Sequence, residues 1–231
     1  MSSTRMVIPA SGQIRGGALS CLLAEVKPTQ NYLGLPCKVK LAQGRAIAII
    51  GSSGQVGLPT VKALLASGTH TITAVQRIEA TSTFSPEVIV KSGNLEDESF
   101  LASTFQGHDA VVLMPPLPQL VSLQEPAVRA AAKAGVPYIL PAEFGPDPFA
   151  SQLIEENQLL QDKKKICDLI EKLGVSSWIS VAVAKIWTGA VGKVDTSSVA
   201  QTGQATAAVL GLPGQDLSRH KNKAFYAPSF L

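Results

Sequence analysis

The sequence predicts an α/β fold in which helices cover both faces of a parallel sheet. From residue 46 onward, short apolar runs alternate with segments of helical periodicity, and the first apolar run leads directly into a glycine-rich turn. A strand, a helix and a second strand in succession form a right-handed crossover, so this alternation makes neighbouring strands parallel. The chain of 231 residues, with 45% hydrophobic and 16% charged residues, has the composition of one large globular domain.

The elements can be placed in order along the chain. Strands are expected at residues 46–50, 71–76, 87–91, 109–113, 136–140 and 177–183. Helices are expected at about 55–67, 96–105, 119–134 and 152–173, followed by a last helix at about 197–211 and a short strand at 222–227. The first four helices are followed by Gly68, Gly107, Gly135 and Gly174, where a left-handed conformation favours glycine. We expect Pro126 to kink the third helix or to delay its start.

The turn after the first strand is the most informative stretch. In a strand–turn–helix unit Gly51 permits the tight turn, Gly54 lets the backbone approach a pyrophosphate, and Gly57 lets the helix pack closely on the strand. Backbone N–H groups at the start of the helix favour an anion. The turn therefore predicts a dinucleotide site in a Rossmann-type domain, formed by Gly51, Ser53, Gly54, Gln55, Val56 and Gly57. A glycine loop that only caps the helix is the alternative.

Arg77 follows the second strand and indicates which dinucleotide would bind. An NAD enzyme usually carries Asp or Glu near this point for the ribose hydroxyls, but no acid stands next to Arg77. A guanidinium there can bind the ribose 2′-phosphate through two hydrogen bonds. We therefore expect NADP(H) as the cofactor, with a solvated surface arginine as the alternative.

Charge, hydropathy and cysteine content exclude several classes of protein. Residues 1–44 hold five basic residues and one acidic residue, so the rest of the chain is close to neutral and shows no basic surface for nucleic acid. No apolar run approaches the roughly 18 residues of a membrane span. Three cysteines outside any CxxC pair indicate a reducing compartment, which we expect to be the cytoplasm, and argue against disulfides and a metal site.

Residues 1–44 show no sustained period of 2 or 3.6 and are rich in Gly, Pro and Ser. We expect a disordered extension. Residues 1–24 contain arginine and serine with no acid, which faintly resembles a mitochondrial transit peptide. A poorly ordered tail, or a wrongly assigned start upstream of the real protein, is the simpler interpretation.

The candidate chemistry centres on Lys163. The Tyr-x-x-x-Lys pair of ordinary short-chain dehydrogenases is absent, so a different proton donor is needed. On a helical wheel Lys163 lies within about 60° of the centre of the apolar stripe, whereas Lys164 lies nearly opposite and Lys165 about 100° away. Lys163 should therefore border the buried face, where it can polarise or protonate a substrate or can snorkel over apolar surface.

Two further candidates follow strands at the edge where open parallel sheets bind ligands. Pro115 comes after the strand at 109–113, and Glu143 comes after the strand at 136–140. We assign both to cofactor binding. For Glu143, a catalytic role, the orientation of a hydroxyl and a cap on the next element remain alternatives.

Five stretches together resemble the NmrA-like and isoflavone reductase-like family, and fungal members most closely. They are GSSGQVG at 51–57, Arg77, SGNLEDESFL at 92–101, PAEFGPDP at 141–148 and KKKICDLIEKLG at 163–174. The resemblance covers residues 46–187 well and 195–231 more loosely. It implies an atypical relative of the short-chain dehydrogenases that binds NADP(H), and it places the family's catalytic lysine at Lys163.

The chain also departs from the family pattern. Ala142 and Asn94 replace the Ser of Pro-Ser-Glu-Phe-Gly and the Asp of Gly-Asp-Leu. The family's substrate lobe is longer than the residues available here. We therefore expect an NAD(P)-binding domain at 45–187 and, at 188–231, the remnant of a small, curtailed C-terminal substrate lobe.

The leading expectation is an NADPH-dependent reductase of a small, aromatic or phenylpropanoid-like molecule, with Lys163 acting on the substrate. A second expectation comes from another class: a regulator that senses NADP(H) and binds a protein partner without turnover, as some NmrA-like proteins do. A degenerate fragment that only binds dinucleotide is a third.

Overall fold

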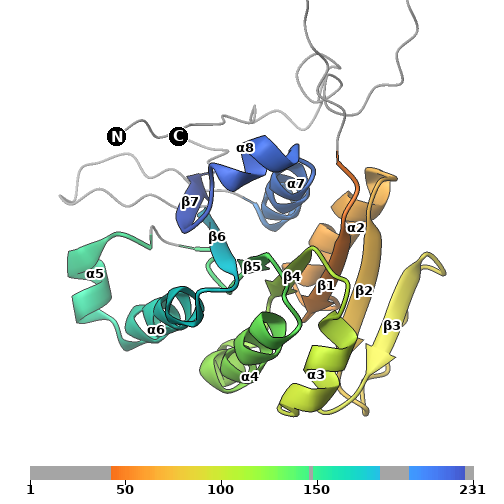
Figure 1. The fold of residues 1–231 in the computed structure, drawn as a ribbon, viewed down its shortest axis with the longest axis horizontal. Coiled ribbons are helices and arrows are strands. Elements are labelled where there is room, and N and C mark those ends of the chain that lie inside the picture. Colours follow the sequence, from red (N-terminus) through yellow and green to blue (C-terminus); the bar gives the residue numbers. More distant parts are fainter. Residues whose placement is uncertain (1–42, 146–147, 183–197, 227–231) are drawn as a thin grey trace, which may run out of the picture.

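The computed structural model describes residues 43–145, 148–182 and 198–226, and it contains one parallel sheet of seven strands (Figure 1). The strands are β1 (Ala46–Ile50), β2 (Thr71–Gln76), β3 (Val88–Ser92), β4 (Ala110–Leu113), β5 (Tyr138–Leu140), β6 (Ser177–Ala182) and β7 (Lys223–Tyr226). Their order across the sheet is β3-β2-β1-β4-β5-β6-β7, and every neighbouring pair is parallel. The order reverses between β1 and β4, which is the switch point of a doubly wound fold. The predicted Rossmann-type sheet is confirmed.

Helices form a layer on each face of this sheet. They are α2 (Gly57–Ala66), α3 (Glu98–Phe105), the short 3-10 helix η1 (Leu117–Gln119), α4 (Leu120–Lys133), α5 (Ser151–Glu156), α6 (Gln158–Leu173), α7 (Val199–Leu210) and α8 (Gly214–Ser218). One buried cluster joins the sheet to α3, α4 and α6, and the other joins it to α2, α7 and α8. Figure 1 shows α7 and α8 across the sheet from α4 and α6.

Strand β1 shows why the sequence folds this way. Ala48 and Ile50 belong to the cluster with α3, α4 and α6, whereas Ile47 and Ile49 belong to the cluster with α2, α7 and α8. Successive side chains of a strand point to opposite faces, so a strand covered on both faces must be apolar throughout. Because both faces are covered, the carboxyl end of β1 is the place where a polar ligand can reach it.

One of the expected elements is wrong. The helix expected at 152–173 is divided at Asn157, whose extended backbone separates α5 from α6. The Asn157 side chain accepts from the N–H of Leu160 at 3.3 Å and so caps α6. Helix α4 begins at Leu120 and runs through Pro126, so the proline does not delay its start. The four helix-ending glycines do adopt positive φ angles, between 66° and 78°.

The described part of the C-terminal segment completes this sheet and its helical layer. Strand β7 pairs with β6, and α7 packs against α2. The contact is close, because a Cβ atom on Gly203 would lie 2.7 Å from the backbone carbonyl carbon of Pro59. At the far end of α7 the buried guanidinium of Arg45 donates to the carbonyl oxygens of Leu210, the last helical residue, and of Leu212 just beyond it.

Most of the expected extension at 1–44, and residues 188–197 and 227–231 of the expected lobe, lie outside the described residues. Among the helices in the described ranges, none has the length and apolar character needed to cross a membrane. Within those same ranges, no cluster of His, Cys, Asp or Glu side chains is suited to hold a metal ion.

Candidate functional site

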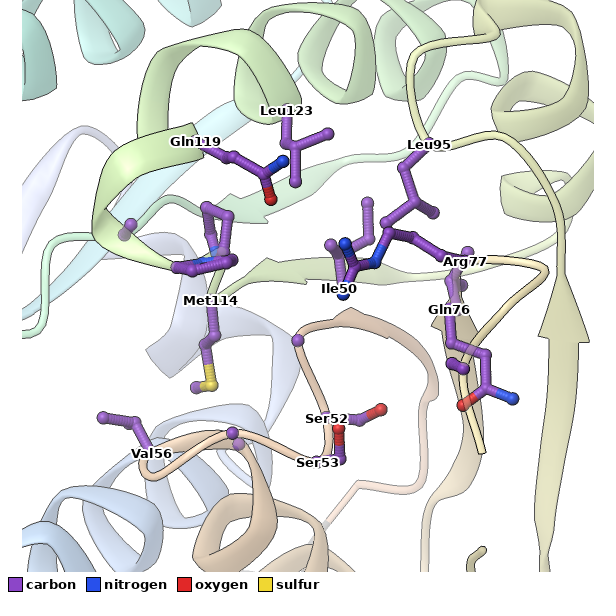
Figure 2. A pocket seen from close by; sticks show the side chains of 18 of the residues that line it. Ile50, Ser52, Ser53, Val56, Gln76, Arg77, Leu95, Met114, Gln119 and Leu123 are labelled. Carbon is purple, nitrogen blue, oxygen red and sulfur yellow. The ribbon is translucent and has the colours of Figure 1, made fainter. Parts of the chain in front are cut away.

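A cleft of about 790 Å³ opens at the carboxyl ends of β1, β2 and β4 (Figure 2). The turn between β1 and α2 forms one side, and the start of α4 lies opposite. Nine of the ten predicted site residues line the cleft: Gly51, Ser53, Gly54, Gln55, Val56, Gly57, Arg77, Pro115 and Lys163. The tenth, Glu143, is not among the lining residues, although its neighbours Ala142 and Phe144 are. The structure thus brings together residues from six separate stretches of the chain.

The three glycines of the turn differ in what fixes them. Gly51 has a φ of +81°, and a Cβ atom on it would lie 2.0 Å from the carbonyl oxygen of Met114. A Cβ atom on Gly57 would lie 2.0 Å from the carbonyl oxygen of Gly51. Packing within the fold therefore requires glycine at both positions. Gly54 is exposed, and a Cβ atom there would come no closer than 3.2 Å to the Gly51 oxygen. Packing within the fold therefore does not require glycine at this position.

The start of α2 pairs only some of its amide groups with backbone carbonyls. Leu58 and Thr60 donate to the carbonyl oxygens of Gly54 and Val56, at 2.9 and 3.2 Å. Among the described residues, no backbone carbonyl accepts from the N–H groups of Gln55, Val56 or Gly57. The helix also has no side-chain cap and no acid in its first turn. An open helix N-terminus beside a bare backbone fits a pyrophosphate.

The end of β2 supplies the second polar part of the cleft. In Figure 2 the Arg77 side chain extends from this strand end into the cleft toward Ile50. None of the ion pairs found between described residues involves Arg77, so its charge is available to a ligand. The neighbouring Gln76 donates to Ser92 Oγ at 3.3 Å, while its Oε1 atom is buried with no partner in the structure. These groups fit the polar ribose and phosphate of a dinucleotide.

Two buried polar side chains fix the segment that follows β5. Gln124 of α4 accepts from the N–H of Ala142 at 2.8 Å. Ser180 of β6 donates to the carbonyl oxygen of Glu143 at 3.0 Å. Both side chains are almost fully buried, so the segment is held between α4 and β6. Phe144 thereby faces the cleft while Glu143 faces into the protein.

Lys163, on α6, lines the same cleft as Arg77. Its Nζ atom lies 3.5 Å from Glu143 Oε2, and the two side chains are only 9% and 5% exposed. Burial raises the pKa of Glu143, an effect that the neighbouring Lys163 charge opposes but does not cancel. Lys164 and Lys165 are exposed and pair with Asp168 and Asp162. The predicted orientation of the three lysines is confirmed, whereas the role of Lys163 stays a prediction.

Sequence reasoning missed Gln124 and Ser180. Gln124 lies on the buried face of α4, beside the apolar positions Leu123 and Ala127, and this polar break in an apolar face was the available signal. Ser180 stands within an apolar strand and gives no comparable signal. The ion pair of Glu143 could not be predicted either, since the sequence does not show how the segment after β5 lies relative to α6.

Comparisons with known proteins agree with this geometry. The model of the NmrA-like family matches residues 43–221. Among solved structures, the chain is similar to a protein bound to NADP⁺ and (+)-pinoresinol, with 21% identity and a TM-score of 0.60 over 80% of this chain and 70% of that one. It is similar to the leucoanthocyanidin reductase–NADPH complex from Vitis vinifera, with 16% identity and a TM-score of 0.60 over 78% and 68% of the two chains.

It is also similar to isoflavone reductase, with 21% identity and a TM-score of 0.59 over 78% of this chain and 68% of that one. At such identities these likenesses show a shared fold. No curated protein matches the sequence. The family model covers most of the chain, from the first strand through the helices of both layers, and the protein belongs to the NmrA-like family.

Proposed function

We propose that this protein is an NADPH-dependent reductase of a small organic molecule. One observation carries the proposal: an open helix N-terminus, Arg77 and the buried Lys163 line a single cleft. Similar solved structures bound to NADP⁺ or NADPH support the choice of cofactor.

The residues of the turn and the end of β2 would hold the cofactor. The N–H groups of Gln55, Val56 and Gly57 would donate to the pyrophosphate, and Gly54 would leave room for it. Arg77 would bind the 2′-phosphate that distinguishes NADPH from NADH. When bound, NADPH supplies the hydride.

Lys163 would act on the substrate. An ammonium in a poorly hydrated wall can polarise a carbonyl, or protonate an oxygen or carbon that gains negative charge when hydride arrives. The buried Leu123 and the half-buried Met114 and Phe144 line the same cleft and would exclude water. This apolar lining favours an aromatic or phenylpropanoid-like substrate, and the pinoresinol and leucoanthocyanidin reductase relatives support that class.

The test begins with binding. NADPH fluorescence should change on titration with the protein, and a panel of aromatic ketones, enones and benzylic ethers should then cause loss of NADPH absorbance. Lys163→Met should reduce kcat by at least about 100-fold while the Kd for NADPH stays nearly constant. Lys164→Met, on the exposed face of the same helix, is the matched control. Equal losses in both variants would contradict the assignment of Lys163.

A regulator that binds NADP(H) and a protein partner without turnover is the second candidate. It is favoured by Ala142, which lines the cleft and offers no hydroxyl group there. This function predicts that NADPH binds normally, that no compound in the panel is reduced, and that a purified partner binds with an affinity that NADPH changes.

A further inference from the structure

We propose that Glu143 is a positioning residue that holds Lys163 in its charged form at the wall of the cleft. The role of Lys163 as proton donor rests on the proposed function, whereas the electrostatic coupling of the two side chains is independent of it. This role differs from the cofactor contact that the sequence predicts for Glu143.

The two side chains lie one behind the other in the cleft wall. Lys163 lines the cleft, and Glu143 lies behind it, with Oε2 at 3.5 Å from Nζ. On its other side Glu143 borders a second cavity, of about 210 Å³, which Phe149 and Trp178 also line. Glu143 therefore contacts the ammonium from the side away from any ligand, where it can act only through Lys163.

The backbone around Glu143 is fixed before any ligand binds. Gln124 and Ser180 hold the segment at successive residues, through hydrogen bonds of 2.8 and 3.0 Å. Gly145 leaves room for the Lys163 ammonium, because even a Cβ atom at this position would lie 3.8 Å from Lys163 Nζ. The backbone that carries the Glu143 carboxylate is thus held in place beside Lys163.

The other charged groups nearby are already paired or neutral. On the next turns of α6, Asp168 pairs with the exposed Lys164, and Glu171 accepts from Trp178 Nε1 at 2.7 Å. Burial raises the pKa of the Cys167 thiol, so it stays neutral at physiological pH. In the part of the chain that the structure describes, Glu143 is the one carboxylate that pairs with Lys163. Its removal would leave a buried ammonium without compensation, which favours the neutral amine.

The experiment measures the charge of Lys163 directly. Acetic anhydride acylates neutral amines, so the extent of labelling at each pH, read by fragment-ion mass spectrometry, gives a half-labelling pH for each lysine. Glu143→Gln should lower the half-labelling pH of Lys163 by about one to three units, whereas Glu143→Asp should lower it less. Lys164 and Lys165 serve as internal references.

Glu171→Gln is the matched control, because this carboxylate lines the second cavity but does not pair with Lys163. An unchanged half-labelling pH in Glu143→Gln would overturn the proposal, as would an equal shift in Glu171→Gln. If Glu143→Gln fails to fold, the labelling of the wild type tests the proposal. The proposal fails if Lys163 becomes reactive at a lower pH than Lys164, because Lys163 is then not held in its charged form.

The pH dependence of kcat adds a measurement that a purely structural role of Glu143 would not change. In Glu143→Gln, the pH above which kcat declines should fall by the same amount as the half-labelling pH, and the KM for NADPH should stay constant. A uniform loss of kcat at every pH would instead contradict the positioning role. If NADPH neither binds nor is oxidised and the labelling shift still occurs, the proposed function fails while the coupling of Glu143 to Lys163 stands.

Discussion

The stability of the Lys163–Glu143 pair can be tested by a double-mutant cycle with Lys163→Met, Glu143→Gln and the double variant. Two unit charges 3.5 Å apart attract by about 5 kcal/mol at an effective dielectric constant of about 20. Desolvation of both groups offsets much of this gain. Each single variant leaves one buried charged group without its partner, whereas the double variant removes both charges. We therefore expect a coupling free energy of about 2–3 kcal/mol at neutral pH.

The pH dependence of the cycle follows from Glu143. Its pKa is already raised by burial, and Lys163→Met removes the charge that lowers it. In that variant the folded protein would bind a proton more tightly than the unfolded chain. The extra stability is complete below the unfolded pKa of about 4.5 and is lost as the pH rises through the folded value. Lys163→Met should therefore be closer to wild type at pH 5 than at pH 8.

Urea unfolding followed by circular dichroism gives the free energy of unfolding of all four proteins at both pH values. The matched control is Lys164→Met, whose side chain is exposed, and it should change stability by less than about 0.5 kcal/mol. Additive effects of the two substitutions, within about 0.5 kcal/mol at both pH values, would refute the electrostatic coupling.

Three further predictions concern the cofactor and the fold. Arg77→Ala should lower the preference for NADP over NAD by about 10- to 100-fold in titrations, since a charge-assisted hydrogen bond contributes about 1.5–3 kcal/mol; equal preferences in variant and wild type would contradict this. Gly54→Val should abolish NADPH binding with the circular dichroism spectrum unchanged, whereas Gly57→Ala should lower the Tm because its Cβ meets a carbonyl oxygen at 2.0 Å. Burial lowers the pKa of His70 and of His220, so the folded state binds protons less readily and stability should fall below about pH 6.5. Thermal scans should show a smaller acid loss in His70→Gln.

Local sequence patterns were sufficient for the central sheet. Strand β1 is covered on both faces, and its five-residue apolar run, rich in isoleucine and followed by a glycine-rich turn, is typical of such a buried strand. The turn at 51–57 was equally readable, because two of its glycines are required by contacts within the turn and with the end of β4. Where a residue's surroundings come from its own strand–turn–helix unit, the sequence determines its environment.

Contacts between distant segments could not be predicted. Glu143 stands at the edge of the sheet where ligands bind, and from the sequence it belongs with the cofactor residues. Its side chain instead faces away from the cleft, because Gln124 and Ser180 hold the backbone from two other elements. Similarly, the division of the helix at Asn157 depends on competition between helix propagation and an asparagine cap, which periodicity does not reveal.

The ion pair bears on the choice between a reductase and a regulator. Buried ion pairs add little stability, and apolar side chains of similar size often serve the fold as well or better. The phosphates of a dinucleotide would bind near Arg77 and the turn, which belong to other elements of the cleft than Lys163 on α6. A protein that only binds NADP(H) therefore has no physical need for a charged Lys163, whereas a reductase needs a proton donor where the hydride is delivered. If the double variant Lys163→Met/Glu143→Gln binds NADPH like the wild type but has lost all turnover, the ion pair is needed for catalysis. If the wild type has no turnover and the double variant loses NADPH-dependent binding of the partner protein, the ion pair is needed for regulation.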